Sequence, residues 1–219
     1  MKYYFFLITI MVMLSLLGGS EILAEEKTKI VINIPATTLY LYQGEKLIKE
    51  YRITVGRIDA LTPIGNFKVI NKMINPTWYP PDGRDPIPPG PENELGTRWI
   101  GIDKLHYGIH GTIKPQEIGK ATSDGCMRLK NEDIEELYSL ISPKTSVEIR
   151  YQTINVKKRK EIVKITIYSD IYALRTNTIK RLKKKTGLEM DDSFWKDAIK
   201  EAEEKGFYRF VVFSSGVRE

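Results

Sequence analysis

The sequence contains little cysteine and little histidine: its 219 residues include one cysteine, Cys126, and two histidines. A single cysteine excludes an intramolecular disulfide, which is the usual form of cysteine in exported proteins. Cys126 is therefore either incidental or kept as a free thiol. Because an isolated cysteine is most often a small buried apolar residue, its sequence neighbours must decide between these interpretations.

The sequence also lacks a long hydrophobic run. The uncharged stretch from Tyr3 to Leu17 follows Lys2 and is shorter than the roughly 20 residues that a membrane-spanning helix needs. Small residues and Ala24 come next, so we expect residues 1–24 to be a cleaved signal peptide. The mature protein would then act outside the cytoplasm, in the periplasm or the cell wall. An uncleaved membrane anchor is the alternative, because Ile22 is imperfect in a cleavage site.

The excess of positive charge is confined to the end of the chain. The net charge is +6; residues 25–154 hold 17 Lys/Arg and 17 Asp/Glu, whereas residues 155–219 hold 16 and 10. This asymmetry predicts two regions, a catalytic domain over 25–152 and a basic accessory domain over 153–219. The basic region either meets an anionic envelope polymer or membrane surface, or is simply solvated. We expect no nucleic-acid partner, because the chain has no base-reading motif.

The pattern of apolar residues predicts a mainly β fold in the first region. Short β-branched and aromatic runs separated by glycine turns indicate strands over residues 28–55, 67–70, 98–102, 107–110 and 145–151. One helix is expected after Asn131, which would be its N-cap, with Ser142-Pro143 ending it. In the accessory domain we expect an α+β arrangement in the order β-α-α-β. It has strands at 162–168 and 207–213 and two helices, one capped by Asp170 and the other by Asp191 or Asp192.

Residues 75–91 hold seven of the eleven prolines, so they fit neither a central strand nor a helix. We expect a long ordered loop, a kind of segment that often binds ligands. Trp78 and Tyr79 would supply aromatic contact surface for a substrate, or would only pack the loop against itself.

His110 and Cys126 are a candidate base and nucleophile. An imidazole can take the thiol proton, and the resulting ion pair would lower the thiol pKa. The imidazole also needs an acceptor that fixes its tautomer, and the carbonyl of Gly111 could serve. The backbone N–H groups of Gly125 and Cys126 are candidate donors to an oxyanion. The alternative is a structural histidine and a buried cysteine.

The surrounding residues resemble a known family. His110-Gly111-Thr112 and the stretch Ile118 to Leu129, which contains Ser123-Asp124-Gly125-Cys126-Met127-Arg128, are similar to the signature of the YkuD-type L,D-transpeptidases. Further similar blocks are Thr62 to Phe67, Asn75 to Pro81, Leu95 to Gly101 and Asn131 to Tyr138. The resemblance covers roughly residues 29–151, in order, and does not explain residues 155–219.

The resemblance implies a β-rich catalytic fold and a cysteine acyl-transfer mechanism without metal or cofactor. Cys126 would be the nucleophile, His110 the base oriented by the Gly111 carbonyl, and Gly125 part of the oxyanion hole. The acyl donor would be a peptidoglycan tetrapeptide stem, which forms a thioester with Cys126 and releases D-Ala. An amine of a second stem or of a protein would then resolve the thioester.

Three neighbours of Cys126 are further candidates for substrate contact, and two of them allow two roles each. Arg128 would bind a stem carboxylate or make a structural ion pair. Ser123 would donate a hydrogen bond in the site or only form the turn. Asp124 stands where the family commonly has histidine, and its charge would disfavour the thiolate. We expect His106, the other histidine, to be structural.

The leading hypothesis is an exported L,D-transpeptidase. An L,D-carboxypeptidase would use the same residues with water as acceptor, so the sequence does not separate the two. A third hypothesis, prompted by Asp124 and the basic region, is a non-catalytic cell-wall-binding protein. A degenerate enzyme usually loses its nucleophile, whereas Cys126 and His110 are both present.

Overall fold

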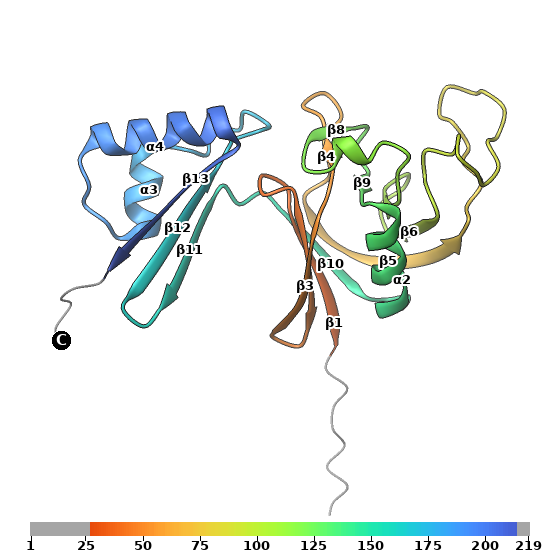
Figure 1. Ribbon diagram of the computed structural model, residues 1–219, viewed down its shortest axis with the longest axis horizontal. Helices are drawn as coiled ribbons and strands as arrows, with labels where there is room; N and C mark the ends of the chain where they lie inside the picture. The colour runs from red at the N-terminus through yellow and green to blue at the C-terminus, as the bar shows by residue number, and fades with distance from the viewer. Residues whose placement is uncertain (1–26, 214–219) are drawn as a thin grey trace, which may run out of the picture.

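The computed structural model describes residues 27–213, so the expected signal peptide, 1–24, lies outside the described range. Figure 1 shows two sheets side by side, joined by the connection from β10 to β11. Within residues 27–213 no helix has the length and apolar character to cross a membrane.

The larger sheet has eight strands in the order β3-β2-β1-β10-β5-β6-β7-β9. Two neighbouring pairs are parallel, β1 with β10 and β7 with β9. A two-stranded ribbon of β4 and β8 lies at one end of it, beside β9 (Figure 1). The elements up to residue 150 are β1 (Thr28–Asn33), β2 (Thr38–Gln43), β3 (Lys46–Arg52), β4 (Val55–Gly56), β5 (Gly65–Ile74), β6 (Arg98–Ile102), β7 (Gly108–His110), the 3₁₀ helix η1 (Pro115–Glu117), β8 (Ala121–Ser123), β9 (Met127–Arg128), α2 (Asn131–Leu140) and β10 (Ser146–Arg150).

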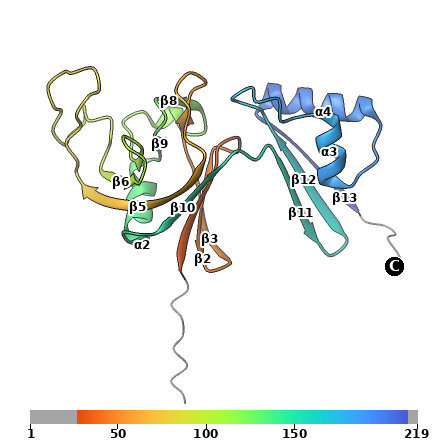
Figure 2. The same ribbon diagram turned by 180° about the vertical axis from the view of Figure 1, so that it is seen from behind.

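The second sheet has three antiparallel strands in the order β11-β12-β13, and α3 and α4 cover one of its faces (Figure 2). Its elements are β11 (Ile154–Arg159), β12 (Ile162–Tyr168), α3 (Ile179–Thr186), α4 (Asp192–Lys205) and β13 (Phe207–Phe213). The chain is thus mostly β, as predicted.

The buried apolar side chains form two clusters, one under each sheet. The first contains the inward-facing residues of the eight-stranded sheet and the apolar face of α2, including Ile134 and Leu137. The second surrounds Trp195, which is fully buried between α4 and the three-stranded sheet. The division is crossed after β12, where Tyr172 belongs to the first cluster and Ile171 packs against it.

The prediction for the accessory domain was wrong in two elements. A strand, β11, precedes the predicted β-α-α-β order, because Ile154 and Val156 pair with β12 and pack on the second cluster. The helix expected after Asp170 begins only at Ile179, with Thr178 as its N-cap. The carboxylate of Asp170 instead accepts hydrogen bonds from the N–H groups of Leu174 and Thr176, which closes a turn. Aspartate favours both arrangements, so the local sequence did not distinguish them.

The cap of α2 also differs from the prediction. Lys130 is the N-cap, and Asn131 is the first helical residue. The Asn131 side chain accepts hydrogen bonds from the N–H groups of Thr97 and Thr112 instead. Asn131 therefore ties the helix to the residues just before β6 and just after β7, the strand that ends at His110.

Candidate active site

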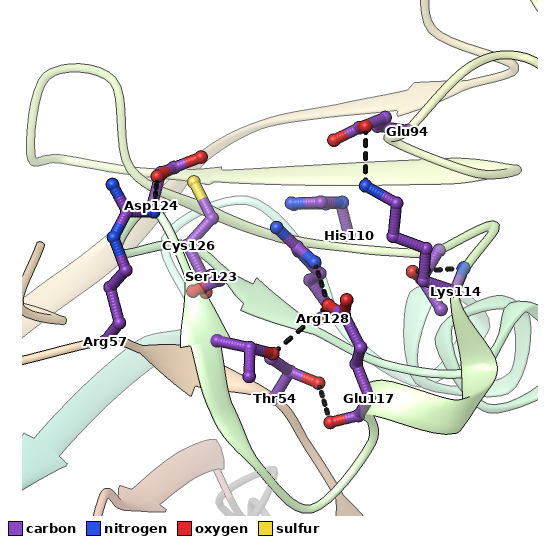
Figure 3. A network of polar contacts seen from close by, with 12 residues as sticks. Thr54, Arg57, Glu94, His110, Lys114, Glu117, Ser123, Asp124, Cys126 and Arg128 are labelled. Atoms are coloured by element: carbon purple, nitrogen blue, oxygen red, sulfur yellow. Dashed lines mark hydrogen bonds and ion pairs between the residues drawn. The ribbon is translucent and has the colours of Figure 1, made fainter.

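Strand pairing brings the two candidate catalytic residues together. β7 and β9 are parallel neighbours, with Ile109 opposite Met127 and His110 opposite Arg128. Cys126 immediately precedes β9, so it lies at the start of the strand that flanks His110. Figure 3 shows both side chains in one site, with the far end of the imidazole directed toward the cysteine.

The imidazole of His110 is buried and fixed. Its Nδ1 lies 2.8 Å from the Gly111 carbonyl oxygen, which is the contact that the family resemblance implies. When Nδ1–H donates to this oxygen, Nε2 is left as the acceptor. The Trp99 ring stacks on the imidazole with centroids 5.7 Å apart. Burial, and then the charge of Arg128, lower the pKa of His110 from 6.5 to about 4, so the imidazole is neutral at pH 7.

Gly111 stands where no larger residue fits. A Cβ atom on Gly111 would lie 2.2 Å from the Asn131 Oδ1 atom. This close approach allows Asn131 to accept hydrogen bonds from the N–H groups of Thr97 and Thr112. Because the Thr112 N–H and the Gly111 carbonyl belong to one planar peptide unit, the hydrogen bond to Asn131 also fixes the carbonyl that holds His110.

The thiol of Cys126 is free, and it lies 3.5 Å from the His106 carbonyl oxygen, to which it can donate. Burial raises the pKa of the Cys126 thiol. Both shifts favour the neutral form of the two groups, because desolvation disfavours the charged form of each. His106, expected to be structural, contributes its backbone to the site.

The turn before Cys126 positions a backbone donor. Ser123 is buried, donates to the Cys126 carbonyl oxygen (2.5 Å) and accepts from the Gly125 N–H (3.2 Å). Gly125 has φ +105°, which favours glycine, and a Cβ there would meet the Tyr107 ring at 2.7 Å. The Gly125 N–H donates to Ser123, whereas the Cys126 N–H has no acceptor among residues 27–213. Of the two candidate oxyanion donors, the Cys126 N–H is therefore the available one.

Arg128 makes an ion pair, one of the two roles left open by the sequence. Its guanidinium lies 2.7 Å from a carboxylate oxygen of Glu117 and is largely buried. Thr122 also donates to the same oxygen of Glu117. Arg128 therefore ties β9 to the segment before β8, and its charge disfavours protonation of the neighbouring His110.

Asp124 is exposed and pairs with Arg57, a residue that the sequence did not bring to attention. Arg57 also contacts Asp59. The charge of Asp124 raises the pKa of the Cys126 thiol, but it is the smallest of the influences on that thiol. Arg57 supplies the counter-charge to Asp124, and the charge of Arg128 lowers the thiol pKa.

Trp78 and Tyr79 lie on the proline-rich loop, which projects beside the site-bearing end of the domain (Figure 1). Backbone pairing of Trp78 with Ile87 closes the loop, and Arg84 lies over the Trp78 ring at 5.7 Å. The Tyr79 side chain is 73% exposed. The segment is a loop, as predicted, and its far end returns to the site, where Glu94 pairs with Lys114 (Figure 3).

Sequence reasoning missed the supporting residues Arg57, Glu117 and Thr62. Thr62 was noted only as the start of a block that resembles the family, yet its hydroxyl accepts from the Gly56 N–H and donates to the Gly125 carbonyl. No local pattern marks these residues, because each meets the site through a long-range contact.

The comparisons with known proteins concern this same part of the chain. A family model described as "L,D-transpeptidase catalytic domain" (YkuD) matches residues 27–149. A putative L,D-transpeptidase YkuD from Bacillus licheniformis is 40% identical over 121 residues, 55% of this chain and 64% of that protein. Its Bacillus subtilis counterpart is 41% identical over 120 residues, with the same coverage. The chain thus spans less than two thirds of these curated relatives.

Among solved structures, the chain is similar to one titled "Structure of the Ldtfm-avibactam carbamoyl enzyme". The TM-score is 0.50 at 25% identity, over 58% of this chain and 50% of that one.

Proposed function

The chain belongs to the YkuD family of L,D-transpeptidase catalytic domains, and on that premise we propose that it is a cysteine-dependent L,D-transpeptidase. Its substrates would be peptidoglycan tetrapeptide stems. The observation that carries the proposal is the fixed, buried His110, whose Nδ1 is held by Gly111 and whose far end is directed toward Cys126 (Figure 3).

The proposed reaction begins with two neutral groups. As the Cys126 sulfur attacks the carbonyl carbon before the terminal D-Ala, the thiol proton passes to Nε2 of His110. The carbonyl becomes an oxyanion, which the unpaired Cys126 N–H stabilises. Charge thus appears only as the C–S bond forms, which suits a site that disfavours a resting ion pair.

The tetrahedral intermediate then expels D-Ala. The C–N bond breaks, the departing amine takes the proton from His110, and a thioester to Cys126 remains. In the second half, the neutral imidazole accepts a proton from an incoming amine as it attacks the thioester. The products are an amide and a restored Cys126 thiol. Water in place of the amine would give the carboxypeptidase reaction with the same residues.

Product analysis tests this proposal and separates the two reactions. Protein spanning residues 25–219 is incubated with a disaccharide-tetrapeptide, and the products are separated by chromatography and weighed. A cross-linked dimer with released D-Ala supports transpeptidation, whereas a tripeptide alone indicates the carboxypeptidase. Absence of both in wild type, with products no different from those of Cys126→Ala, would contradict the proposed activity and favour the wall-binding alternative.

The same proposal includes export. The charged start and the apolar run from Tyr3 to Leu17 support a cleaved signal peptide over 1–24, which would deliver the enzyme to the periplasm or the cell wall. Mass spectrometry of the mature N-terminus tests this; an intact Met1 on secreted or membrane-bound protein would contradict cleavage.

We further propose that the basic accessory domain binds an anionic envelope polymer through the face of its sheet opposite α3 and α4. Lys157 and Lys164 stand directly opposite each other on β11 and β12. Like charges directly opposite each other destabilise a sheet, and a bound anionic ligand would reduce this repulsion. With Arg209 they line a cavity of about 90 Å³, which Glu50 faces from the neighbouring domain. The remaining lining residues are Tyr40, Asn155, Thr166 and Tyr168.

Sedimentation with purified sacculi tests this binding face. Neutralising Lys157, Lys164 and Arg209 to Gln should weaken binding and flatten its salt dependence, because fewer counterions would be displaced. The matched control neutralises Lys180, Lys184 and Lys185 on α3, which should bind as wild type. Binding to vesicles with anionic lipids but not to sacculi would overturn the polymer as ligand.

A further inference from the structure

A tyrosine of the accessory region is built into the catalytic domain. Tyr172 lies beyond the family match, which ends at residue 149. Its side chain is 4% exposed and belongs to the core cluster of the eight-stranded sheet. The ring stacks on Tyr151 with centroids 5.3 Å apart. The packing therefore joins the segment after β12 to the domain that carries Cys126.

The hydroxyl of Tyr172 begins a short chain of contacts that ends at the nucleophile. It accepts a hydrogen bond from the Thr62 N–H at 3.1 Å. The Thr62 hydroxyl in turn donates to the Gly125 carbonyl oxygen at 2.9 Å. Thr62 is buried, with 1% of its surface exposed, so neither contact is readily replaced by water.

The Gly125 carbonyl and the Cys126 N–H belong to one planar peptide unit. In a trans peptide the two groups point in opposite directions, so a hydrogen bond that fixes the carbonyl also fixes the direction of the N–H. The Cys126 N–H is the oxyanion donor of the proposed reaction. Such donors act only when held in place before the charge develops.

Tyr172 is in turn held from the accessory domain. Its N–H donates to the Tyr151 hydroxyl, which donates to the Asp170 carboxylate. The Asp170 N–H donates to Glu203 on α4, as does the Ser169 hydroxyl. The segment 169–176 is thus anchored to α4 at one end and reaches Thr62 with the ring of Tyr172.

We propose that Tyr172 is a positioning residue for the reaction, acting through Thr62 to orient the Gly125–Cys126 peptide. The inference rests on the proposed function. It also gives the accessory domain a role in the chemistry itself, because that domain holds Tyr172 in place. Tyr172 would not touch the substrate.

The test compares two variants of the chain spanning residues 25–219, Tyr172→Phe and Tyr208→Phe. Tyr208→Phe is the control, because it removes a hydroxyl from the same domain at a position away from Thr62. Removing the Tyr172 hydroxyl leaves the buried Thr62 N–H unpaired, so kcat should fall about tenfold while KM changes less than about twofold. Tyr208→Phe should match wild type. Equal kcat in Tyr172→Phe and wild type would overturn the proposal.

A double substitution separates positioning from general stabilisation. Thr62→Val removes the hydroxyl that holds Gly125, at nearly constant volume. If Tyr172 acts through Thr62, the Tyr172→Phe/Thr62→Val double variant should lose no more kcat than Thr62→Val alone. If the losses of kcat from the two single substitutions multiplied in the double variant, action through Thr62 would be contradicted. A structural role of Tyr172 that is independent of Thr62 would add its own loss to that of Thr62→Val.

Alkylation of Cys126 by iodoacetamide keeps this test independent of the proposed activity. Loosening the turn exposes the thiol, so in Tyr172→Phe the pH midpoint of alkylation should move down and the rate at pH 7 should rise at least about threefold. Tyr208→Phe should keep the wild-type profile. If wild type fails to react with tetrapeptide, the proposed function is wrong; unchanged alkylation in Tyr172→Phe would mean that the positioning role is wrong.

Discussion

At the scale of single residues, the site depends on burial as much as on catalytic residue type. Cys126 and His110 were recognisable from the sequence because their neighbours match a family pattern. Their protonation was not recognisable, because it depends on how much water the fold removes. Burial raises the pKa of the thiol and lowers that of the imidazole, and both shifts favour the neutral forms.

The pH profile of acylation should reflect this. The pKa of His110 is lowered to about 4, so its neutral, proton-accepting form persists above that pH. We expect the kcat/KM of acylation to stay level from about pH 8 to about pH 5 and to fall only as pH approaches about 4. An acid limb centred near the ordinary histidine value of about 6.5 would show that His110 is not desolvated in the working enzyme. Quenched-flow measurement of D-Ala release at each pH provides the profile.

Asp124 should have little influence on the rate. Its carboxylate pairs with Arg57 at the surface, and it contributes least to the raised thiol pKa. We expect Asp124→His to keep or raise kcat/KM by no more than about threefold, since exposed ion pairs are worth about 0–1 kcal/mol. Arg57→Gln is the matched variant: it leaves Asp124 unpaired near the thiol and should be slower than Asp124→His. A large loss in Asp124→His would instead give Asp124 a direct role in catalysis.

At the scale of secondary-structure elements, hydrophobic alternation and glycine turns predicted most strands correctly. The closing strand, Phe207–Phe213, and the helix ending before Gly206 follow their sequence signals closely. The two wrong cap assignments share one cause. Asp170 and Asn131 both looked like helix caps, but each side chain bonds elsewhere: Asp170 within a turn, and Asn131 to residues just before β6 and just after β7. Capping residues have several possible partners, and tertiary contacts choose among them.

Asn131 offers a test of an element held in place by a side chain. Asn131→Ala would leave the N–H groups of Thr97 and Thr112 without their acceptor, at a cost of about 1–3 kcal/mol. We expect a lower thermal unfolding midpoint and reduced activity. Asn131→Asp retains the acceptor oxygen and should restore much of both. Ser139→Ala, at an exposed position on the same helix, is the control; an equal effect there would contradict the assignment.

At the scale of the whole molecule, the family signature accounts for the catalytic domain and not for its connection to the rest. The charge asymmetry indicated a second region, but no sequence pattern showed that Tyr172 packs into the first core. Contacts such as Tyr172 with Thr62 join residues 110 positions apart. The geometry of such contacts depends on how the two sheets meet. Local secondary-structure propensities carry no information about that arrangement.

The most direct test of the central claim is intact-protein mass spectrometry of residues 25–219 mixed with a disaccharide-tetrapeptide, comparing wild type with Cys126→Ala. The proposal predicts a mass gain in wild type equal to the stem minus D-Ala, located on the peptide that contains Cys126. His110→Ala should strongly reduce the gain, and Cys126→Ala should lack it. A wild-type protein that gains no mass and yields no product, or an adduct that persists in Cys126→Ala, would contradict the thioester mechanism.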